Sequence, residues 1–248
     1  ELAGKVLGAT EINISVAASS VSKGETLIDT GKTLNAMKVD FIVIRHSMAG
    51  APALLAKNVT ASVLNGGDGM HEHPTQALLD MFTIRNRYGR LKGLKVAILG
   101  DLKHSRVAMS NLFGLQKAGA EVYMYAPETM IPAEMDRLGA HICKSREEAV
   151  EGADAVMGLR IQLERMNGGL IPSLSEYSKF YGVNDGILKL AKKDAVILHP
   201  GPVNRGVELT PQLIDGKDSL ILEQVTNGVA VRMALLKLLS EYREKNNL

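Results

Sequence analysis

The sequence contains little of what marks secreted, membrane-spanning or nucleic-acid-binding proteins. It has one cysteine, Cys143, so no intrachain disulfide can form, which fits a reducing compartment. Its 29 Lys and Arg residues barely exceed its 27 Asp and Glu residues, and a net charge of +2 gives no reason to expect a nucleic acid or a membrane surface as a partner. No apolar run approaches the roughly 20 residues of a membrane span, and the first residues do not form a signal peptide. We therefore expect a cytoplasmic globular protein.

Apolar residues, in contrast, are plentiful and follow an alternating pattern. They make up 46% of 248 residues, which suffices for one large domain or two of ordinary size. Short β-branched runs alternate with stretches of helical periodicity, and this alternation indicates parallel sheets flanked by helices. The polar segment 85–93 separates an earlier block of runs from a later one, so we predict two α/β domains with a cleft between them. The runs expected to form strands are 11–16, 41–46, 61–66, 94–100, 120–126, 154–160 and 194–200.

The segment GMHEHPTQALLD, residues 69–80, places polar side chains at the start of a predicted helix. Pro74 suits the first helical position, which makes His73 the cap residue and puts Gln76 in the first turn. A helix start attracts anions and disfavours the imidazolium, so a neutral His73 could donate a hydrogen bond to a carbonyl oxygen. Taken alone, a histidine at this position is more often a simple cap or surface residue. We expect the buried stripe of the helix to be Ala77, Leu78, Met81 and Phe82.

A metal site in the same segment is not supported. His71, Glu72 and His73 resemble a ligand cluster, but no second His, Asp or Cys group stands at a supporting spacing. We therefore expect no metal. Asp68, in the preceding GGDG, is interpreted as a turn residue.

Three arginines lie just beyond predicted strand ends. Arg45 closes FIVIR, Arg160 closes AVMGLR, and Arg106 follows VAILG in GDLKHSR. Ligands of open parallel sheets bind outside the carboxyl ends of the strands, and arginine suits bidentate contact with phosphate or carboxylate. Together with Gln76, Gln162 and the loop HPGP (199–202), these arginines predict small substrates that carry several negative charges.

Six motifs of the sequence occur in the same order in a known family. SSVSKGETLIDT, VIRHS, EHPTQALLD, GDLKHSR, LRIQLER and HPGPVNRGVE resemble the catalytic chain of aspartate carbamoyltransferase, within the aspartate/ornithine carbamoyltransferase superfamily. That family makes N-carbamoyl-aspartate and phosphate from carbamoyl phosphate and aspartate in pyrimidine biosynthesis. HPTQ alone does not separate the aspartate enzymes from their ornithine-using relatives, whereas RIQLER and SKGE favour the aspartate branch. The resemblance covers essentially the whole chain.

The resemblance implies a domain plan and an assembly. Each of two domains would be a parallel sheet flanked by helices, with the active site in the interdomain cleft. Residues 1–89, completed by a C-terminal helix at 225–248, would form the carbamoyl-phosphate domain, and residues 90–224 the aspartate-binding domain. The family forms homotrimers with shared active sites; the resemblance leaves open larger assemblies with regulatory or dihydroorotase chains.

The resemblance also assigns roles to individual residues. Arg45 and His73 would hold the carbonyl oxygen of carbamoyl phosphate, and Gln76 its carbamoyl nitrogen. Lys23, with Ser20 in the same loop, would reach the active site of a neighbouring subunit. The expected contacts to carbamoyl phosphate are Arg45, His73, Gln76, Ser20 and the backbone of Gly201 and Pro202, and the expected contacts to aspartate are Lys23, Arg106, Arg160 and Gln162.

The chemistry suits these residue types. Attack of an amine on the carbamoyl carbon builds an oxyanion, which prepositioned donors stabilise. Positioning and charge stabilisation supply the catalysis, so no nucleophilic side chain, metal or cofactor is expected.

One departure from the family concerns the phosphate anchor. In the family a Ser-Thr-Arg-Thr-Arg loop precedes a Phe-Glu-Leu-Ala-like stretch, whereas this sequence opens at ELAG. We interpret ELAGKVLGA as the last turns of a helix and expect the phosphate loop to be missing, with poor or absent turnover. A fragment of a longer chain is favoured over a natural loss, because every downstream motif is intact.

Three other functions remain as alternatives. A family member without its phosphate loop could act as a non-catalytic assembly partner, and an ornithine-type carbamoyltransferase would share most motifs. A dinucleotide-dependent enzyme is disfavoured because VAILGDLKHSR lacks G-x-G-x-x-G and a suitably spaced acidic residue.

Overall fold

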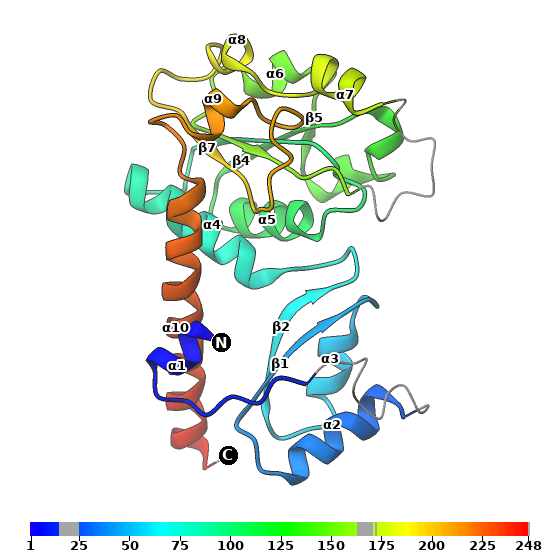
Figure 1. Ribbon diagram of the computed structural model, residues 1–248, viewed down its shortest axis with the longest axis vertical. Coiled ribbons are helices and arrows are strands. Elements are labelled where there is room, and N and C mark those ends of the chain that lie inside the picture. Colours follow the sequence, from blue (N-terminus) through cyan, green and yellow to red (C-terminus); the bar gives the residue numbers. More distant parts are fainter. Residues whose placement is uncertain (15–24, 163–170, 172, 248) are drawn as a thin grey trace. The chain divides into compact units, whose positions relative to one another are not determined.

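The chain folds into two compact units. The computed structural model describes residues 1–14, 25–162, 171 and 173–247 (Figure 1). Unit 1 comprises Glu1–Thr75 and Gly228–Leu248, and unit 2 comprises Gln76–Asn227. Ser20 and Lys23 lie outside the described residues.

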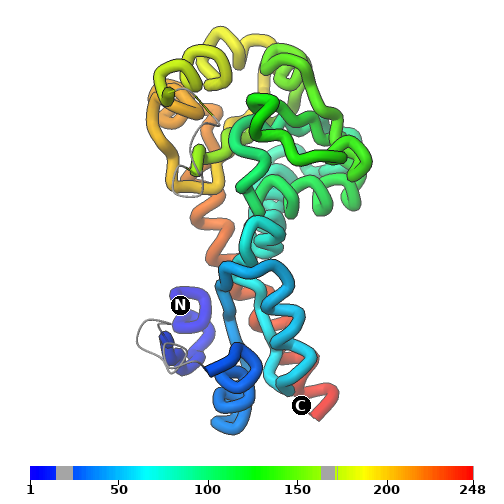
Figure 2. The backbone as a smooth tube through the Cα atoms, turned by 90° about the vertical axis from the view of Figure 1, so that its right-hand side faces the viewer, coloured from blue at the N-terminus to red at the C-terminus, as the bar shows by residue number. Residues whose placement is uncertain are grey.

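Unit 1 is built on a pair of parallel strands, which Figure 1 draws as arrows, and Figure 2 traces the backbone of the chain as a tube. Strand β1 (Phe41–His46) pairs with β2 (Ser62–Asp68), and Phe41 lies opposite Ser62. Ile42, Leu55 and Ala61 form the buried centre. The run 11–16 was expected to be a strand, but residues 11–14 form none, and 15 and 16 are not described. The helices of unit 1 are α1 (Leu2–Val6), α2 (Leu27–Ala36), α3 (Ala51–Ala56) and the later part of α10 (Ile221–Asn246).

Unit 2 is a five-stranded parallel sheet with the order β5-β4-β3-β6-β7. Its strands are β3 (Lys95–Leu99), β4 (Glu121–Tyr125), β5 (His141–Ile142), β6 (Ala155–Gly158) and β7 (Val196–Leu198). Its helices are α4 (Pro74–Tyr88, from Gln76 onward), α5 (Arg106–Lys117), α6 (Arg146–Val150), α7 (Leu174–Phe180), α8 (Asp185–Leu188), α9 (Pro211–Ile214), the start of α10, and the 3-10 turns η3 (Glu128–Met130) and η4 (Met135–Leu138). Of the six other runs that were predicted to form strands, five match the observed strands closely. The sixth, 61–66, matches β2, which ends later than predicted, at Asp68. The predicted parallel α/β fold is confirmed.

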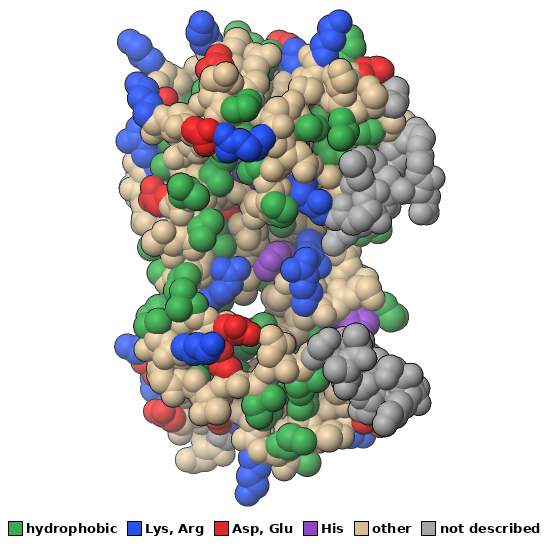
Figure 3. Space-filling view, viewed as in Figure 1, with side chains coloured by type: hydrophobic (Ala, Val, Ile, Leu, Met, Phe, Trp, Pro, Cys, Tyr) green, Lys and Arg blue, Asp and Glu red, His purple; other side chains and the backbone are tan. Residues whose placement is uncertain are grey.

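The sheet of unit 2 is buried on both faces. Alternate residues of β3 enter different apolar clusters, with Val96 and Ile98 in one and Ala97 and Leu99 in the other. Such a strand shows a continuous apolar run instead of an alternating one, as VAIL does after Lys95. On the face of unit 2 shown in Figure 3, hydrophobic, acidic and basic side chains are interspersed.

A glycine closes the carboxyl end of β3. Gly100 has φ +134°, and a Cβ atom there would lie 2.6 Å from the carbonyl oxygen of Leu159. The loops that follow β3 and β6 therefore approach each other more closely than any larger residue would permit.

Helix α4 begins at Pro74, as predicted, but the predicted buried stripe is only partly correct, since Ala77 is buried and Met81 packs against the core while Leu78 does not. Leu78 is 42% exposed, whereas the polar residues Gln76, Asp80 and Thr83 are buried. Ile84 belongs to the same apolar cluster as the β3 residue Val96, so most of α4 packs with unit 2. For this reason the two units divide after Thr75, earlier than the expected residue 89.

Helix α10 starts in unit 2 and ends in unit 1, with the division at Asn227 and Gly228. None of the helices in the described part of the chain is long and apolar enough to cross a membrane.

Candidate functional site

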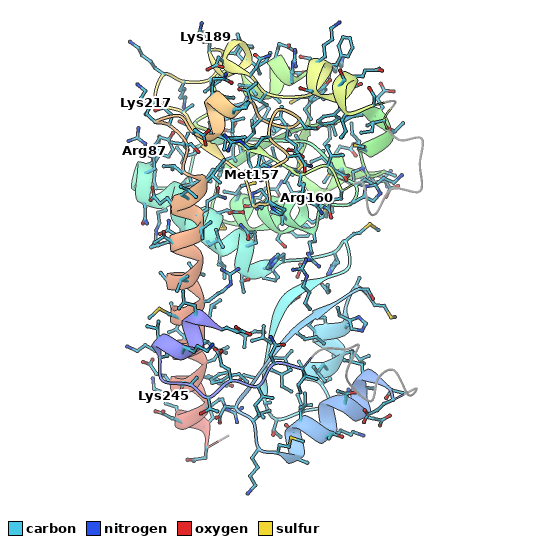
Figure 4. All side chains as sticks on the ribbon, in the orientation of Figure 1. Arg87, Met157, Arg160, Lys189, Lys217 and Lys245 are labelled. Carbon is cyan, nitrogen blue, oxygen red and sulfur yellow. The ribbon has the colours of Figure 1, made fainter. Side chains whose placement is uncertain are left out.

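The strand order of unit 2 reverses between β3 and β6. The chain proceeds from β3 to β4 and β5 on one side, and β6 and β7 lie on the other. In open parallel sheets, ligands bind at such a reversal, outside the carboxyl ends of the strands. Arg106 follows β3, and Arg160 lies beyond the carboxyl end of β6, past Met157 (Figure 4). Both predicted arginines of unit 2 therefore flank this switch point.

A buried carboxylate organises the loop between β3 and α5. Asp101 has no exposed surface and accepts hydrogen bonds from the His104 backbone N–H (3.1 Å) and the Gln162 backbone N–H (3.3 Å). The Nδ1 atom of His104 lies 2.8 Å from Asp101 Oδ1. The Gln162 side chain donates from Nε2 to the His104 carbonyl oxygen at 3.0 Å, so Gln162 is held against this loop. Asp101 and His104 were missed as site-forming residues, although GD directly after a buried strand is a recognisable signal.

Arg106 occupies the first turn of a twelve-residue helix. Ser105 caps α5 by accepting a hydrogen bond from the Ala108 N–H at 3.2 Å. Arg106 itself is only 6% exposed. A buried cation at the positive end of a helix gains nothing from the helix dipole, and both charges favour an anion nearby. This is the arrangement expected for a carboxylate- or phosphate-binding residue.

A second buried carboxylate joins the loop after β6 to the loop after β7. Glu208 accepts from the Ile161 N–H at 2.8 Å, and from the side chain and backbone of Asn204 at 2.7 and 3.0 Å. Burial raises the pKa of Glu208 above its ordinary value, although the hydrogen bonds from Ile161 and Asn204 act in the opposite direction. Glu208 thus fixes the residue after Arg160 next to the segment that contains Gly201 and Pro202.

His199 directly follows β7 and is almost fully buried. Its Nδ1 atom accepts a hydrogen bond from the Gly201 N–H at 2.9 Å, which bends the start of the HPGP loop back on itself. Gly201 has φ +71°, and a cis peptide bond joins it to Pro202. Burial lowers the pKa of His199 to about 4, and the positive charge of Arg160 adds to this effect. The imidazole is therefore neutral at physiological pH.

His199 makes the stability of the fold depend on pH. In the unfolded chain the pKa of His199 returns to 6.5. Between pH 6.5 and about 4 the imidazole is therefore protonated in the unfolded state but neutral in the folded state. Stability from this group is present above pH 6.5 and is lost as the pH falls. We expect wild type to lose roughly 2 kcal/mol more than His199→Asn between pH 7 and pH 5. Urea unfolding at both pH values measures this difference, and equal losses in the two proteins would contradict the burial of a neutral imidazole.

The predicted residues of unit 1 meet at one end of its strand pair. Arg45 is exposed near the end of β1, and the loop that leads to His73 follows β2. The Gly69 N–H donates to the His46 carbonyl oxygen at 2.8 Å, which joins the two strand ends.

Asp68 holds this loop in place and is more than the turn residue expected. It is 2% exposed and accepts from the Gly50 N–H (2.7 Å), the Asn65 side chain (3.0 Å) and the Glu72 N–H (3.0 Å). Burial raises its pKa, but the hydrogen bonds from Asn65, Gly50, His71 and Glu72 together lower it below the ordinary value. The ionised carboxylate of Asp68 therefore holds the segment that contains His73 through hydrogen bonds.

The predicted site residues thus fall into two described groups. Arg45 and His73 share the carboxyl end of the unit 1 strand pair. The second group surrounds the switch point of unit 2 and contains Gln76, Arg106, Arg160, Gln162, Gly201 and Pro202, with Gln76 linked to it through buried hydrogen bonds described below. Within the described ranges, no three His, Cys, Asp or Glu side chains are grouped so as to hold a metal ion.

Sequence comparisons identify two adjoining domains. Residues 1–86 match the family model "Aspartate/ornithine carbamoyltransferase, carbamoyl-P binding domain". Residues 92–239 match "Aspartate/ornithine carbamoyltransferase, Asp/Orn binding domain".

Individual proteins give the same result. The aspartate carbamoyltransferase catalytic subunit of Ruminiclostridium cellulolyticum is 63% identical over 240 residues, which cover 97% of this chain and 77% of the relative. The subunit of Acetivibrio thermocellus is 65% identical with the same coverage. Aspartate transcarbamoylase from Trypanosoma cruzi, in complex with carbamoyl phosphate and aspartate, is 30% identical with a TM-score of 0.81, covering 94% of this chain and 77% of that chain. Ornithine carbamoyltransferase from Thermus thermophilus is 26% identical with a TM-score of 0.83, covering 96% and 79%.

Proposed function

The chain belongs to the aspartate/ornithine carbamoyltransferase family, and on that basis we propose that it transfers the carbamoyl group of carbamoyl phosphate to the amine of L-aspartate. The products are N-carbamoyl-L-aspartate and phosphate, as in pyrimidine biosynthesis. Relatives at 57–65% identity are named as the aspartate enzyme, whereas the ornithine enzyme of Thermus thermophilus is 26% identical. This contrast favours aspartate as the acceptor.

The observation that carries the proposal in structural terms is the pair of guanidinium groups at the switch point of unit 2. Arg106 and Arg160 follow the neighbouring strands β3 and β6. L-Aspartate carries two carboxylates, and each guanidinium can form two parallel hydrogen bonds to one of them. Gln162, held by His104 and Asp101, would add a polar contact to the same amino acid.

The remaining residues would bind the carbamoyl donor. Arg45 and His73 would donate to the carbonyl oxygen, and Gln76 would face the carbamoyl nitrogen. The backbone of Gly201 and Pro202 would lie against the same group. Ser20 and Lys23 retain their proposed roles, towards carbamoyl phosphate and aspartate respectively, although they lie outside the described residues.

The reaction these residues would support is a direct transfer. The aspartate amine attacks the carbamoyl carbon, a C–N bond forms, and the carbonyl oxygen gains negative charge. Donors placed at that oxygen stabilise it more strongly than they stabilise the neutral carbonyl. The C–O bond to phosphate then breaks, phosphate leaves with the electron pair, and the proton of the amine leaves with it.

The proposal is tested by incubating the purified protein with carbamoyl phosphate and either L-aspartate or L-ornithine. The sequence predicts slow turnover, and we expect the product that forms to be N-carbamoyl-aspartate with an equal amount of phosphate, and much less citrulline. Citrulline as the main product would make the protein an ornithine enzyme. No product with either acceptor, from protein that binds aspartate or assembles, would favour the non-catalytic alternative.

Assembly and location follow as further parts of the proposal. We propose a cytoplasmic homotrimer in which Ser20 and Lys23 serve the active site of a neighbouring subunit, with or without regulatory or dihydroorotase chains. Light scattering of the purified protein measures the subunit number, and a monomer that retains full activity would exclude shared sites.

A further inference from the structure

Gln76 belongs to a cluster of four buried polar side chains. At its centre is Asp80, one turn further along α4 and with no exposed surface. Asp80 Oδ1 accepts from Gln76 Nε2 at 2.9 Å and from Gln224 Nε2 at 2.7 Å. Asp80 Oδ2 accepts from Asn111 Nδ2 at 2.7 Å. Gln224 and Asn111 are as deeply buried as Asp80, at 2% and 0% exposure.

The chemistry of this cluster decides which way each amide points. All three amides donate to Asp80 through their NH2 groups, which is the orientation that an ionised carboxylate requires because it accepts hydrogen bonds and has none to donate. For Gln76 this leaves Oε1 as the atom that can turn towards a ligand. A glutamine without this constraint presents either its oxygen or its nitrogen, because the two ends of the amide have nearly the same shape.

The cluster also reaches the HPGP loop. Gln224 directs its NH2 group to Asp80, so its Oε1 atom faces the other way and accepts from the His199 backbone N–H at 2.9 Å. His199 in turn accepts from the Gly201 N–H through Nδ1. Asp80 therefore fixes Gln76 directly and the start of the HPGP loop through one intermediate side chain.

We propose that Asp80 is a positioning residue that selects the donor substrate by holding Gln76 with its Oε1 atom towards the transferred group. The inference rests on the proposed function, in which Gln76 faces the carbamoyl nitrogen. A carbamoyl NH2 group requires an acceptor at this point. A donor with a methyl group in its place, such as acetyl phosphate, leaves the Gln76 oxygen without a partner, and an enzyme discriminates against such an analogue.

A purely structural role is the alternative for a buried aspartate. Asp154 of unit 2 has such a role, because it is 5% exposed and accepts from the Lys95 N–H (2.8 Å) and from Lys192 Nζ (2.7 Å). Loss of a structural aspartate reduces the amount of folded protein and lowers the rates with both donors equally. The ratio of the two rates distinguishes the roles.

The experiment compares Asp80→Asn with the matched control Asp154→Asn. For each protein, kcat/KM is measured with carbamoyl phosphate and with acetyl phosphate at saturating aspartate. The amide introduced by Asp80→Asn can donate to Gln76, which permits the glutamine to turn its NH2 group towards the ligand. We expect the preference for carbamoyl phosphate to fall roughly tenfold or more in Asp80→Asn and to stay at the wild-type value in Asp154→Asn. An unchanged preference in folded Asp80→Asn overturns the proposal.

A double variant tests the same orientation by restoring it. When Asp80→Asn is combined with Gln76→Glu, the new carboxylate accepts from the new amide and again presents an oxygen to the ligand. We expect the preference for carbamoyl phosphate to recover relative to Asp80→Asn, whatever the absolute rate. Failure to recover, with both variants folded, would show that amide orientation does not set the preference.

A measurement on the wild-type protein covers the case in which Asp80→Asn does not fold. Nitrogen-15 NMR follows hydrogen exchange of the side-chain NH2 groups, with the exposed Gln212 as the reference. The bond to buried Asp80 predicts exchange at least tenfold slower for Gln76 than for Gln212. Equal exchange rates would overturn the inference.

The two levels of proposal fail in different ways. A wild-type protein that forms no N-carbamoyl-aspartate contradicts the proposed function. A wild-type protein that forms it, and whose donor preference survives Asp80→Asn, contradicts only the role of Asp80.

Discussion

Replacing His73 by alanine is expected to lower kcat by roughly 10²–10³-fold, the loss typical of removing one donor from an oxyanion site. His73 stands directly before Pro74 at the start of α4, on a loop that the buried carboxylate of Asp68 holds in place. In the proposed role it donates to the carbonyl oxygen as negative charge develops there. Because this interaction strengthens in the transition state, kcat should fall much more than KM for carbamoyl phosphate rises. Steady-state kinetics with both substrates varied measures the two effects separately.

The exposed His141, which stacks on Tyr123, provides the control for this substitution. His141→Ala should leave both constants within about twofold of wild type, since surface changes of this kind have small effects. A His73→Ala protein whose loss lies entirely in KM would assign His73 to ground-state binding and remove it from the oxyanion site.

Arg106→Ala is expected to reduce kcat/KM for aspartate by roughly 10²–10³-fold, equivalent to about 3–4 kcal/mol. The guanidinium is 6% exposed at the start of α5, where it would bind a substrate carboxylate away from bulk water. Arg106→Lys retains the charge but cannot form two parallel hydrogen bonds, so it should recover only part of the loss. Initial rates at varied aspartate, with carbamoyl phosphate saturating, measure both variants.

The control for this prediction is Arg137→Ala. Arg137 lies in the same unit, pairs with Glu134 and has a side chain that is 73% exposed, so kcat/KM should not change. Melting temperatures of all three proteins separate a loss of binding from a loss of folding. An Arg106→Lys protein with wild-type kinetics would mean that Arg106 acts only as a diffuse positive charge.

Strands that are buried on both faces were predicted from the sequence more accurately than helices that are buried on one face. In β3 every residue after Lys95 is apolar, because alternate residues enter the cores on the two faces of the sheet. Strand β5 was missed because His141 and Ile142 form only two residues of ladder, too few to show a period.

The error on α4 has a different physical cause. Its buried face contains Gln76, Asp80 and Thr83, which a hydrophobic pattern assigns to solvent. These groups are buried because partners far along the chain satisfy them. Asn111 and Gln224 donate to Asp80, and Asn227 donates to Thr83 Oγ1 at 2.9 Å. Pairings over 31 and 144 positions leave no local signal in the sequence.

The candidate site shows the same division. Arginines after strand ends could be recognised, because chemistry and topology both point to them. The carboxylates that hold the loops could not be recognised from the sequence. Asp68, Asp101 and Glu208 each collect backbone N–H groups from more than one segment, and those segments meet only in the folded chain.

The discontinuity of unit 1 sets an order of events during synthesis. Its last piece follows the whole of unit 2 along the chain, and Arg243 of that piece donates to the Thr60 carbonyl oxygen at 2.8 Å. A ribosome therefore releases every residue of unit 2 before the segment that completes unit 1 emerges. Domains generally fold as units during translation, so unit 2 can fold before unit 1 is complete. Until the end of α10 has been synthesised, the surface of unit 1 that packs against it stays exposed to solvent.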